Sequence, residues 1–346
     1  LAISRLIICR SFLVTTITII FVLKFHFMGL PLGIGLAYLL ILAYMFKKYK
    51  LKVRFQINRA RLISLIKIGF PIMLIVIAYT FFFTIDRILI FKFLGKENLG
   101  FYGIVLALNG VLLLLPASLG TIIFPRLSEE FGVFGETEKL KEFTYKPTIM
   151  IAYFMSLLIG FIYLFLPTAV KIIIPKYAPG INAGRIALIG ILFFSGSIFS
   201  QKFLVAINRQ MHCLFIVLGA FILKLILIYI FIKQHLGIAG VAMANNIVCF
   251  FYSIFIIILA SYYYKHNFVE SVKYLFKIYL PFAYLFLIFL SFNYFRQTPI
   301  LNISNETMRI SLSFTVLMIL VVLPFGYIIK KNLFAYLSLN LFKDKK

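Results

Sequence analysis

Ten long apolar runs constrain the fold of this chain more than any other feature of its sequence. They cover approximately residues 6–23, 29–46, 66–85, 101–124, 148–167, 185–206, 213–232, 238–262, 274–295 and 308–329. About 20 apolar residues let an α-helix cross the core of a bilayer, whereas a β-barrel shows short alternating segments. With a mean hydropathy of +1.06 and only 13% charged residues, the chain is too apolar for a soluble domain. We therefore expect an all-α polytopic membrane protein with about ten transmembrane helices.

The basic residues between these runs predict the orientation of the chain. Lys and Arg concentrate on the cytoplasmic side of membrane proteins. If the connection at 47–65 is cytoplasmic and the sides alternate, 24 of the 35 Lys and Arg residues lie inside and 10 outside, and Lys224 lies within a run. This asymmetry explains the net charge of +25 without a nucleic-acid partner. It predicts that both ends of the given chain are cytoplasmic.

Acidic residues are too few and too scattered to suggest an enzyme. The chain has ten, five of which lie in segment 129–142, and its two Asp residues are Asp86 and Asp344. The DxD-like pair with which membrane glycosyltransferases often hold a metal is therefore impossible, because the two Asp residues lie 258 positions apart. The three cysteines and four histidines show no CxxC or HExxH spacing. The sequence favours a transporter and predicts no catalytic residues, no metal and no cofactor.

Asp86 is the acid that lies closest to the middle of an apolar stretch, and Arg87 follows it directly. Adjacent residues of a helix point about 100° apart, so each charge needs a partner of its own. Tyr79, seven residues earlier, shares nearly the same face as Asp86, and this stripe is a candidate cavity lining. The alternative is a helix end at the outer interface, where water solvates both charges.

Lys224 lies near the middle of the run 213–232. A charge at this depth costs roughly 2.5–3.5 kcal/mol on insertion scales, and such residues usually face a bundle interior or a polar cavity. One interpretation is a contact with an anionic group of a substrate. The other is a structural ion pair or a lysine whose stem reaches the interface.

Helix-breaking and small residues lie inside several runs. They are Gly69, Pro71, Pro116, Ser195, Gly196, Ser197, Pro281 and Pro324. In transporters such residues interrupt helices around a site that alternates its access. Close packing of helices through small residues is the alternative.

Three segments, in this order, resemble a known family. They are RLISLIKIGFP (61–71), TIDRILIFKFLG (84–95) and GFYGIVLALNGVLLLLPASLGTIIFPRLSEE (100–130). The order resembles the bacterial O-antigen and polysaccharide flippases of the multidrug/oligosaccharidyl-lipid/polysaccharide exporter superfamily. In that family a G-x-P opens the seventh helix, a D-R pair closes it and F-P-R-L-S-E follows the eighth.

This resemblance implies a multidrug-and-toxin-extrusion-like fold. The ten runs would be helices five to fourteen, so the first four helices would be missing, and the chain opens with Leu1 rather than Met. The implied domains are a remnant of the first lobe at 1–62, a second six-helix lobe at 63–265, and two additional helices with a basic tail at 266–346.

The resemblance also implies a function. Such a protein moves an undecaprenyl-diphosphate-linked oligosaccharide across the bacterial inner membrane by alternating access. Arg10, Lys67, Arg87 and Lys224 are candidates for a cationic lining, and Asp86 is a candidate for coupling to a proton or sodium gradient or for bracing a basic residue. The expected partners are the lipid-linked oligosaccharide, membrane lipids and other polysaccharide-assembly proteins.

Two alternatives stay open. A drug exporter of the same superfamily binds organic cations with membrane-embedded acids, whereas this chain offers one such acid against several basic groups. An O-antigen polymerase or ligase usually has a large outer loop, and every predicted outer loop here is short.

Overall fold

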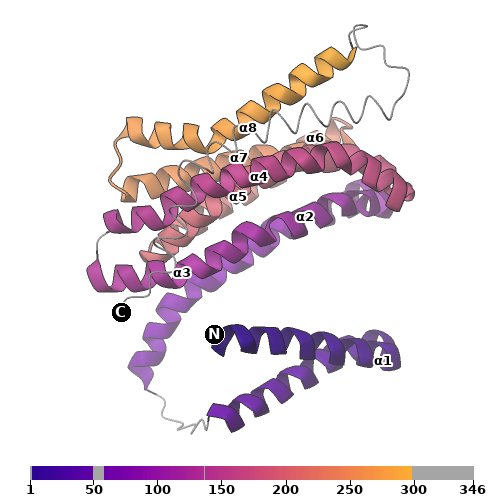
Figure 1. The fold of residues 1–346 in the computed structure, drawn as a ribbon. Coiled ribbons are helices and arrows are strands. Elements are labelled where there is room, and N and C mark those ends of the chain that lie inside the picture. The colour runs from indigo at the N-terminus through magenta and orange to yellow at the C-terminus, as the bar shows by residue number, and fades with distance from the viewer. Residues whose placement is uncertain (1, 50–57, 136, 298–346) are drawn as a thin grey trace. The chain divides into compact units, whose positions relative to one another are not determined.

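The computed structural model describes residues 2–49, 58–135 and 137–297, and these ranges are almost entirely helical (Figure 1). They form α1 (Ala2–Tyr49), α2 (Arg59–Leu112), α3 (Leu114–Phe134), α4 (Thr137–Ile173), the 3₁₀ helix η1 (Pro175–Gly180), α5 (Ile181–Ala206), α6 (Gln210–Lys233), α7 (Gly237–Tyr263) and α8 (Phe268–Gln297). Within the described ranges, six helical stretches are long and apolar enough to cross a membrane. The prediction of an all-α polytopic membrane protein is confirmed. The predicted run 308–329 lies outside the described residues.

The chain divides into two compact units, Leu1–Leu65 and Ile66–Lys346. The boundary lies within the first turns of α2. The predicted division into 1–62, 63–265 and 266–346 assigns lobes of a particular fold to the chain, and it stays a prediction.

In the first unit, α1 folds back on itself, and its two arms meet at the kink and diverge from it (Figure 1). The backbone leaves helical geometry at His26, with φ of 50° and ψ of −128°, between the predicted runs 6–23 and 29–46. A Cβ on Gly29 would lie 2.1 Å from the carbonyl oxygen of Phe21, and one on Gly33 would lie 2.8 Å from Cα of Thr18. The GxxxG spacing of these two glycines therefore lets the arms approach closely, as small residues do between membrane helices.

In the second unit, α2 also reverses direction (Figure 1). The reversal lies at Gly95, with φ of 87° and ψ of 172°, a conformation that is open to glycine and strained for other residues. The chain therefore returns after the predicted run 66–85. After Leu112 the helix is slightly broken before α3 starts. Pro116 accounts for this break, because it has no N–H to donate to the Leu112 carbonyl. The predicted run 101–124 crosses this break.

Helices α2, α5 and α8 continue through the proline and serine positions at which we expected interruptions. Ser195 and Ser197 lie inside α5, and their hydroxyls donate to the carbonyls of Leu192 and Phe194, both at 2.7 Å. Pro71 and Pro281 lie inside α2 and α8. The expectation of interrupted helices at these positions is therefore wrong, because α2, α5 and α8 run through them.

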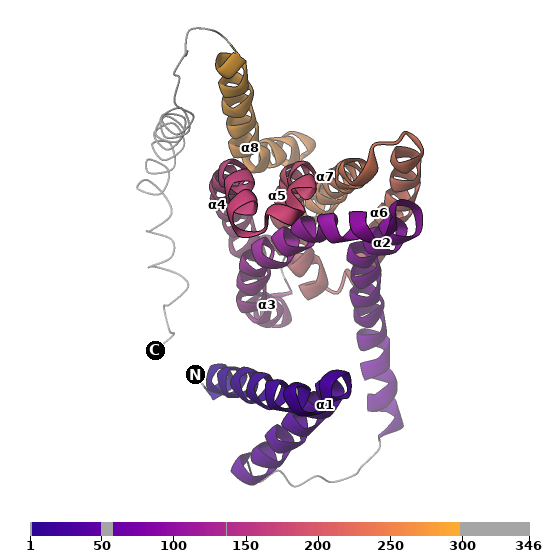
Figure 2. The same cartoon turned by 90° about the vertical axis from the view of Figure 1, so that its right-hand side faces the viewer.

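The core of the second unit is centred on α5, which lies between α4 and α7 (Figure 2). Both faces of α5 are largely buried, whereas α6 exposes large apolar side chains such as Phe215, Ile222 and Ile226. The connections from α5 to α6, α6 to α7 and α7 to α8 are short, which makes consecutive helices antiparallel neighbours. α6 thus packs one side against the described protein core and leaves its other side exposed.

Candidate functional site

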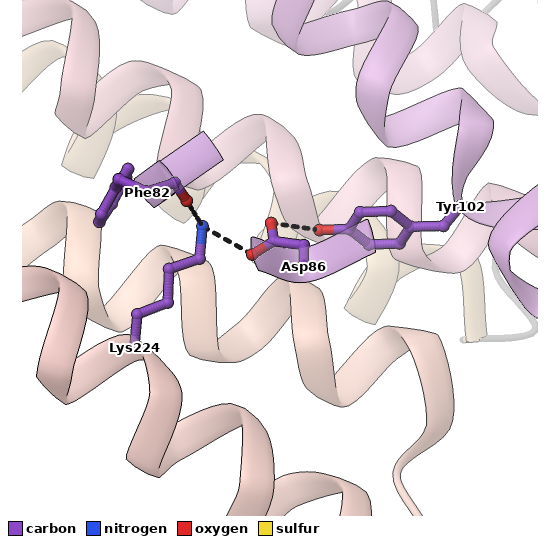
Figure 3. A network of polar contacts seen from close by, with 4 residues as sticks. All are labelled: Phe82, Asp86, Tyr102 and Lys224. Atoms are coloured by element: carbon purple, nitrogen blue, oxygen red, sulfur yellow. Dashed lines mark hydrogen bonds and ion pairs between the residues drawn. The ribbon is translucent and has the colours of Figure 1, made fainter. Parts of the chain in front are cut away.

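Asp86 and Lys224 meet in the interior of the second unit (Figure 3). The Nζ atom of Lys224 lies 2.7 Å from Oδ1 of Asp86. Asp86 is 4% exposed and Lys224 is 0% exposed. Two charges that the sequence places 138 positions apart therefore form one buried ion pair.

Residues of α2 complete the surroundings of both charges (Figure 3). Lys224 Nζ donates a hydrogen bond of 2.7 Å to the backbone carbonyl of Phe82 and lies 4.3 Å from the centre of the Phe82 ring. Tyr102 donates its hydroxyl to Oδ2 of Asp86 at 3.2 Å. A backbone carbonyl, an aromatic ring face and a phenol hydroxyl thus surround the two opposite charges of the pair.

The helical repeat and the reversal at Gly95 explain why these groups converge. Phe82 and Asp86 are four residues apart, so they lie one turn apart on the same face of α2. Tyr102 lies on the returning part of α2 and reaches back to Asp86 across sixteen residues. Lys224 comes from the middle of α6, where its four-carbon stem crosses to α2.

Burial makes the pair energetically important. Each ion loses several kcal/mol of hydration in such surroundings, and their attraction offsets this loss only while both are present. Removing one partner of a buried pair therefore costs about 3–5 kcal/mol. The arrangement brings no third acid to this point, and no cluster of three or more His, Cys, Asp or Glu residues occurs in the described ranges.

The alternative interpretation of Asp86 as part of a solvated helix end is wrong. α2 continues in helical geometry from Asp86 to the reversal at Gly95, and the carboxylate is buried. Arg87 is different, because its side chain is exposed. The two neighbours thus have separate surroundings, as their 100° separation predicts.

Tyr79 lies two turns before Asp86 and contacts α7 rather than an open cavity. Its hydroxyl shares a hydrogen bond with the hydroxyl of Tyr252, and its ring packs edge-on against Tyr252 and Phe194. Tyr252 is 2% exposed. The stripe of Tyr79, Phe82 and Asp86 therefore faces the packed interior of the second unit in this conformation.

The other predicted cationic residues do not share this interior. Lys67 and Arg87 have exposed side chains in the second unit, and Arg10 has an exposed side chain in the first. Of the candidate residues, the structure brings together Asp86 and Lys224.

Sequence reasoning singled out both charges but did not pair them, and it missed Tyr102 and Tyr252. The available signal was the coincidence of one acid and one base, each within an apolar helix, because an uncompensated charge there is costly. For Tyr102 no signal was available, since tyrosines are common in this chain, which has 20 of them.

Residues 32–177 match the sequence model of a family described as polysaccharide biosynthesis protein. The matched range contains Asp86 and Tyr102 but ends before Lys224. A comparison of the chain with curated proteins found no match, and a comparison with solved structures found none either. The predicted resemblance to membrane proteins of polysaccharide assembly is confirmed by this match.

Proposed function

We propose that the protein is a flippase that moves an undecaprenyl-diphosphate-linked oligosaccharide across the cytoplasmic membrane by alternating access. The observation that carries this proposal is the match of residues 32–177, which lie in long apolar helices, to a family of polysaccharide biosynthesis proteins. Sugar repeat units assembled on a lipid at one face of a membrane need a membrane-spanning protein to reach the other face. A chain of apolar helices fits that task.

The charges of the chain suggest which substrate groups are recognised. A diphosphate and acidic sugars are anions, and guanidinium or ammonium groups bind them well. Arg10, Lys67 and Arg87 have exposed side chains and are proposed contacts for these anions. Lys224 is already paired with Asp86, so it would contact substrate only after α2 and α6 separate.

The same pair weighs against an exporter of organic cations. Such an exporter needs a membrane-embedded acid with uncompensated negative charge. The Asp86 carboxylate is neutralised by Lys224 and also accepts a hydrogen bond from Tyr102. The anionic substrate is therefore the better fit, and a proton or sodium gradient is the proposed driving force.

Complementation tests this proposal. The intact gene is expressed in a strain that lacks its own flippase but keeps the rest of a polysaccharide pathway, and surface polysaccharide is measured. We expect polymer to return to the surface and the lipid-linked precursor to stop accumulating inside. Several strains with different repeat units are needed, because flippases can select their sugar. Failure in every strain, with the protein present in the membrane, contradicts the proposal.

A further inference from the structure

The groups around the Lys224 ammonium resemble the ligands of a cation site. They are the carboxylate of Asp86, the backbone carbonyl of Phe82 and the ring face of Phe82, all within one turn of α2 (Figure 3). The cation among them comes from α6 on a flexible stem. Carboxylate and carbonyl oxygens are the ligands that hard cations prefer, and aromatic faces attract cations as well.

The two polar contacts of the ammonium differ in character. Its contact with the Phe82 carbonyl is a directed hydrogen bond of 2.7 Å. Its contact with Oδ1 of Asp86, also at 2.7 Å, is an ion pair between opposite charges. The attraction to Asp86 is that between opposite charges, and it does not require that the cation belong to a lysine. A spherical cation or another ammonium ion can make the same contact.

We propose that Asp86 and Phe82 form a monovalent cation site whose resident cation is the ammonium group of Lys224. The tether keeps the local concentration of this ammonium high, so sodium or another external cation does not compete in the wild-type protein. Removal of the tether leaves the carboxylate and the carbonyl in place and opens the site to an external cation. This inference rests on the geometry of α2 and α6 and holds whether or not the protein moves lipid-linked sugars.

Neighbouring groups support a site for one positive charge. The second oxygen of Asp86 is occupied by the Tyr102 hydroxyl, which satisfies the carboxylate without neutralising it. Since the Asp86 charge is buried in this conformation, leaving it without a cation is costly.

The variant Lys224→Ala tests the proposal. Purified full-length protein is heated in choline chloride, sodium chloride or n-propylammonium chloride at equal ionic strength, and its unfolding temperature is recorded. Propylammonium carries the same charged group on a short apolar chain that fits the space left by the lysine stem. We expect sodium or propylammonium to raise the unfolding temperature of Lys224→Ala by several degrees over choline, because a ligand that binds only the folded state stabilises it.

Two controls identify the site. Asp86→Asn/Lys224→Ala keeps the space but lacks the carboxylate, and it should unfold at the same temperature in all three salts. The wild-type protein should also show no preference. Equal unfolding temperatures of Lys224→Ala in the three salts would overturn the proposal. So would sodium stabilisation of the wild type that Asp86→Asn abolishes, because Lys224 would then not be the resident cation.

Poor folding of Lys224→Ala also gives a result. The variant is then extracted and purified in each salt, and its homogeneity is measured by size-exclusion chromatography. Monodisperse protein in sodium or propylammonium, with aggregation in choline, supports the proposal. Aggregation in all three salts counts against it, because the vacated site has then accepted neither cation.

Discussion

The contact between α5 and α7 and the contact between α2 and α6 join helices in different ways. α5 and α7 meet through a neutral amide and a small residue. Asn246 of α7 accepts a hydrogen bond from the backbone N–H of Gly190 at 2.9 Å and donates one to the carbonyl of Ile186 at 2.6 Å. α2 and α6 meet through full charges, Asp86 and Lys224, within the same unit.

This difference separates packing from function. A neutral amide already joins two membrane helices by hydrogen bonds worth roughly 0.6–1.7 kcal/mol each. A charge pair brings a larger desolvation cost, and its replacement by apolar residues of similar size is often neutral or stabilising. Helix packing alone therefore does not require Asp86 and Lys224. We infer that the pair serves the activity of the protein, whereas Asn246 and Gly190 serve its architecture.

The largest expected effect is that of Lys224→Met. The methionine fills most of the lysine volume but leaves Asp86 buried without a counter-charge, which should lower the free energy of unfolding by about 3–5 kcal/mol. Titration with a denaturing detergent measures this loss. The neutral double variant Asp86→Asn/Lys224→Met should recover most of the lost stability. If the double variant is as unstable as Lys224→Met, the loss comes from packing and not from the unpaired charge.

The next effect concerns the α5–α7 contact. A Cβ at position 190 would lie 2.5 Å from Oδ1 of Asn246, so Gly190→Ala should force the amide aside and cost about 1–3 kcal/mol. The matched control is Gly219→Ala on α6, where a Cβ meets nothing within 4 Å. Both variants are compared by their unfolding temperatures. Equal behaviour of the two alanines would contradict the close approach of α5 and α7.

Tyr102→Phe should have a smaller effect of about 1.5 kcal/mol, because it removes one hydrogen bond to a charged group and leaves the ion pair intact. The same substitution in the background of Asp86→Asn/Lys224→Met should cost less, since the acceptor is then uncharged. A double-mutant cycle over these variants measures the coupling. Equal costs in both backgrounds would show that Tyr102 acts through its ring and not through Asp86.

Arg87→Ala should have the smallest effect. Its side chain is exposed, and surface substitutions usually change stability by less than about 0.5 kcal/mol. Unfolding temperature checks this beside Asp86→Ala, which leaves Lys224 unpaired and should be strongly destabilising. A large loss of stability in Arg87→Ala would mean that the adjacent charges work as one group, against the separation that their positions on α2 indicate.

The sequence predicted which segments form long apolar helices, but it predicted less about which side chains meet. Length and apolarity place a run in the bilayer, and the nine predicted runs within the described ranges all fall on helices. The gaps after residues 23 and 85 contain the reversals at His26 and Gly95. The sequence did not predict the pairing of Asp86 with Lys224, because α6 is apolar on every side and its sequence does not reveal which face meets α2.

Tyr102 illustrates the remaining limit of sequence reasoning. Its contact with Asp86 depends on how tightly α2 reverses at Gly95 and on the rotation of the returning helix, neither of which a run of apolar residues encodes. At Ser195 and Ser197 the error is the opposite one, because the sequence predicted an interruption that the structure does not have. Their short hydroxyl side chains suggested an interrupted helix, yet each hydroxyl bonds to a carbonyl of its own helix.

One measurement tests most directly whether the charge pair serves activity rather than packing. A flippase-deficient strain that the intact wild-type gene complements receives the gene with Asp86→Asn/Lys224→Met, and surface polysaccharide is compared at equal protein levels in the membrane. Gly219→Ala serves as the control with an unaltered pair. We predict that the neutral double variant accumulates in the membrane normally but restores much less polysaccharide than the wild type and Gly219→Ala. Wild-type polysaccharide output from the neutral double variant would contradict the account and would leave Asp86 and Lys224 as packing residues.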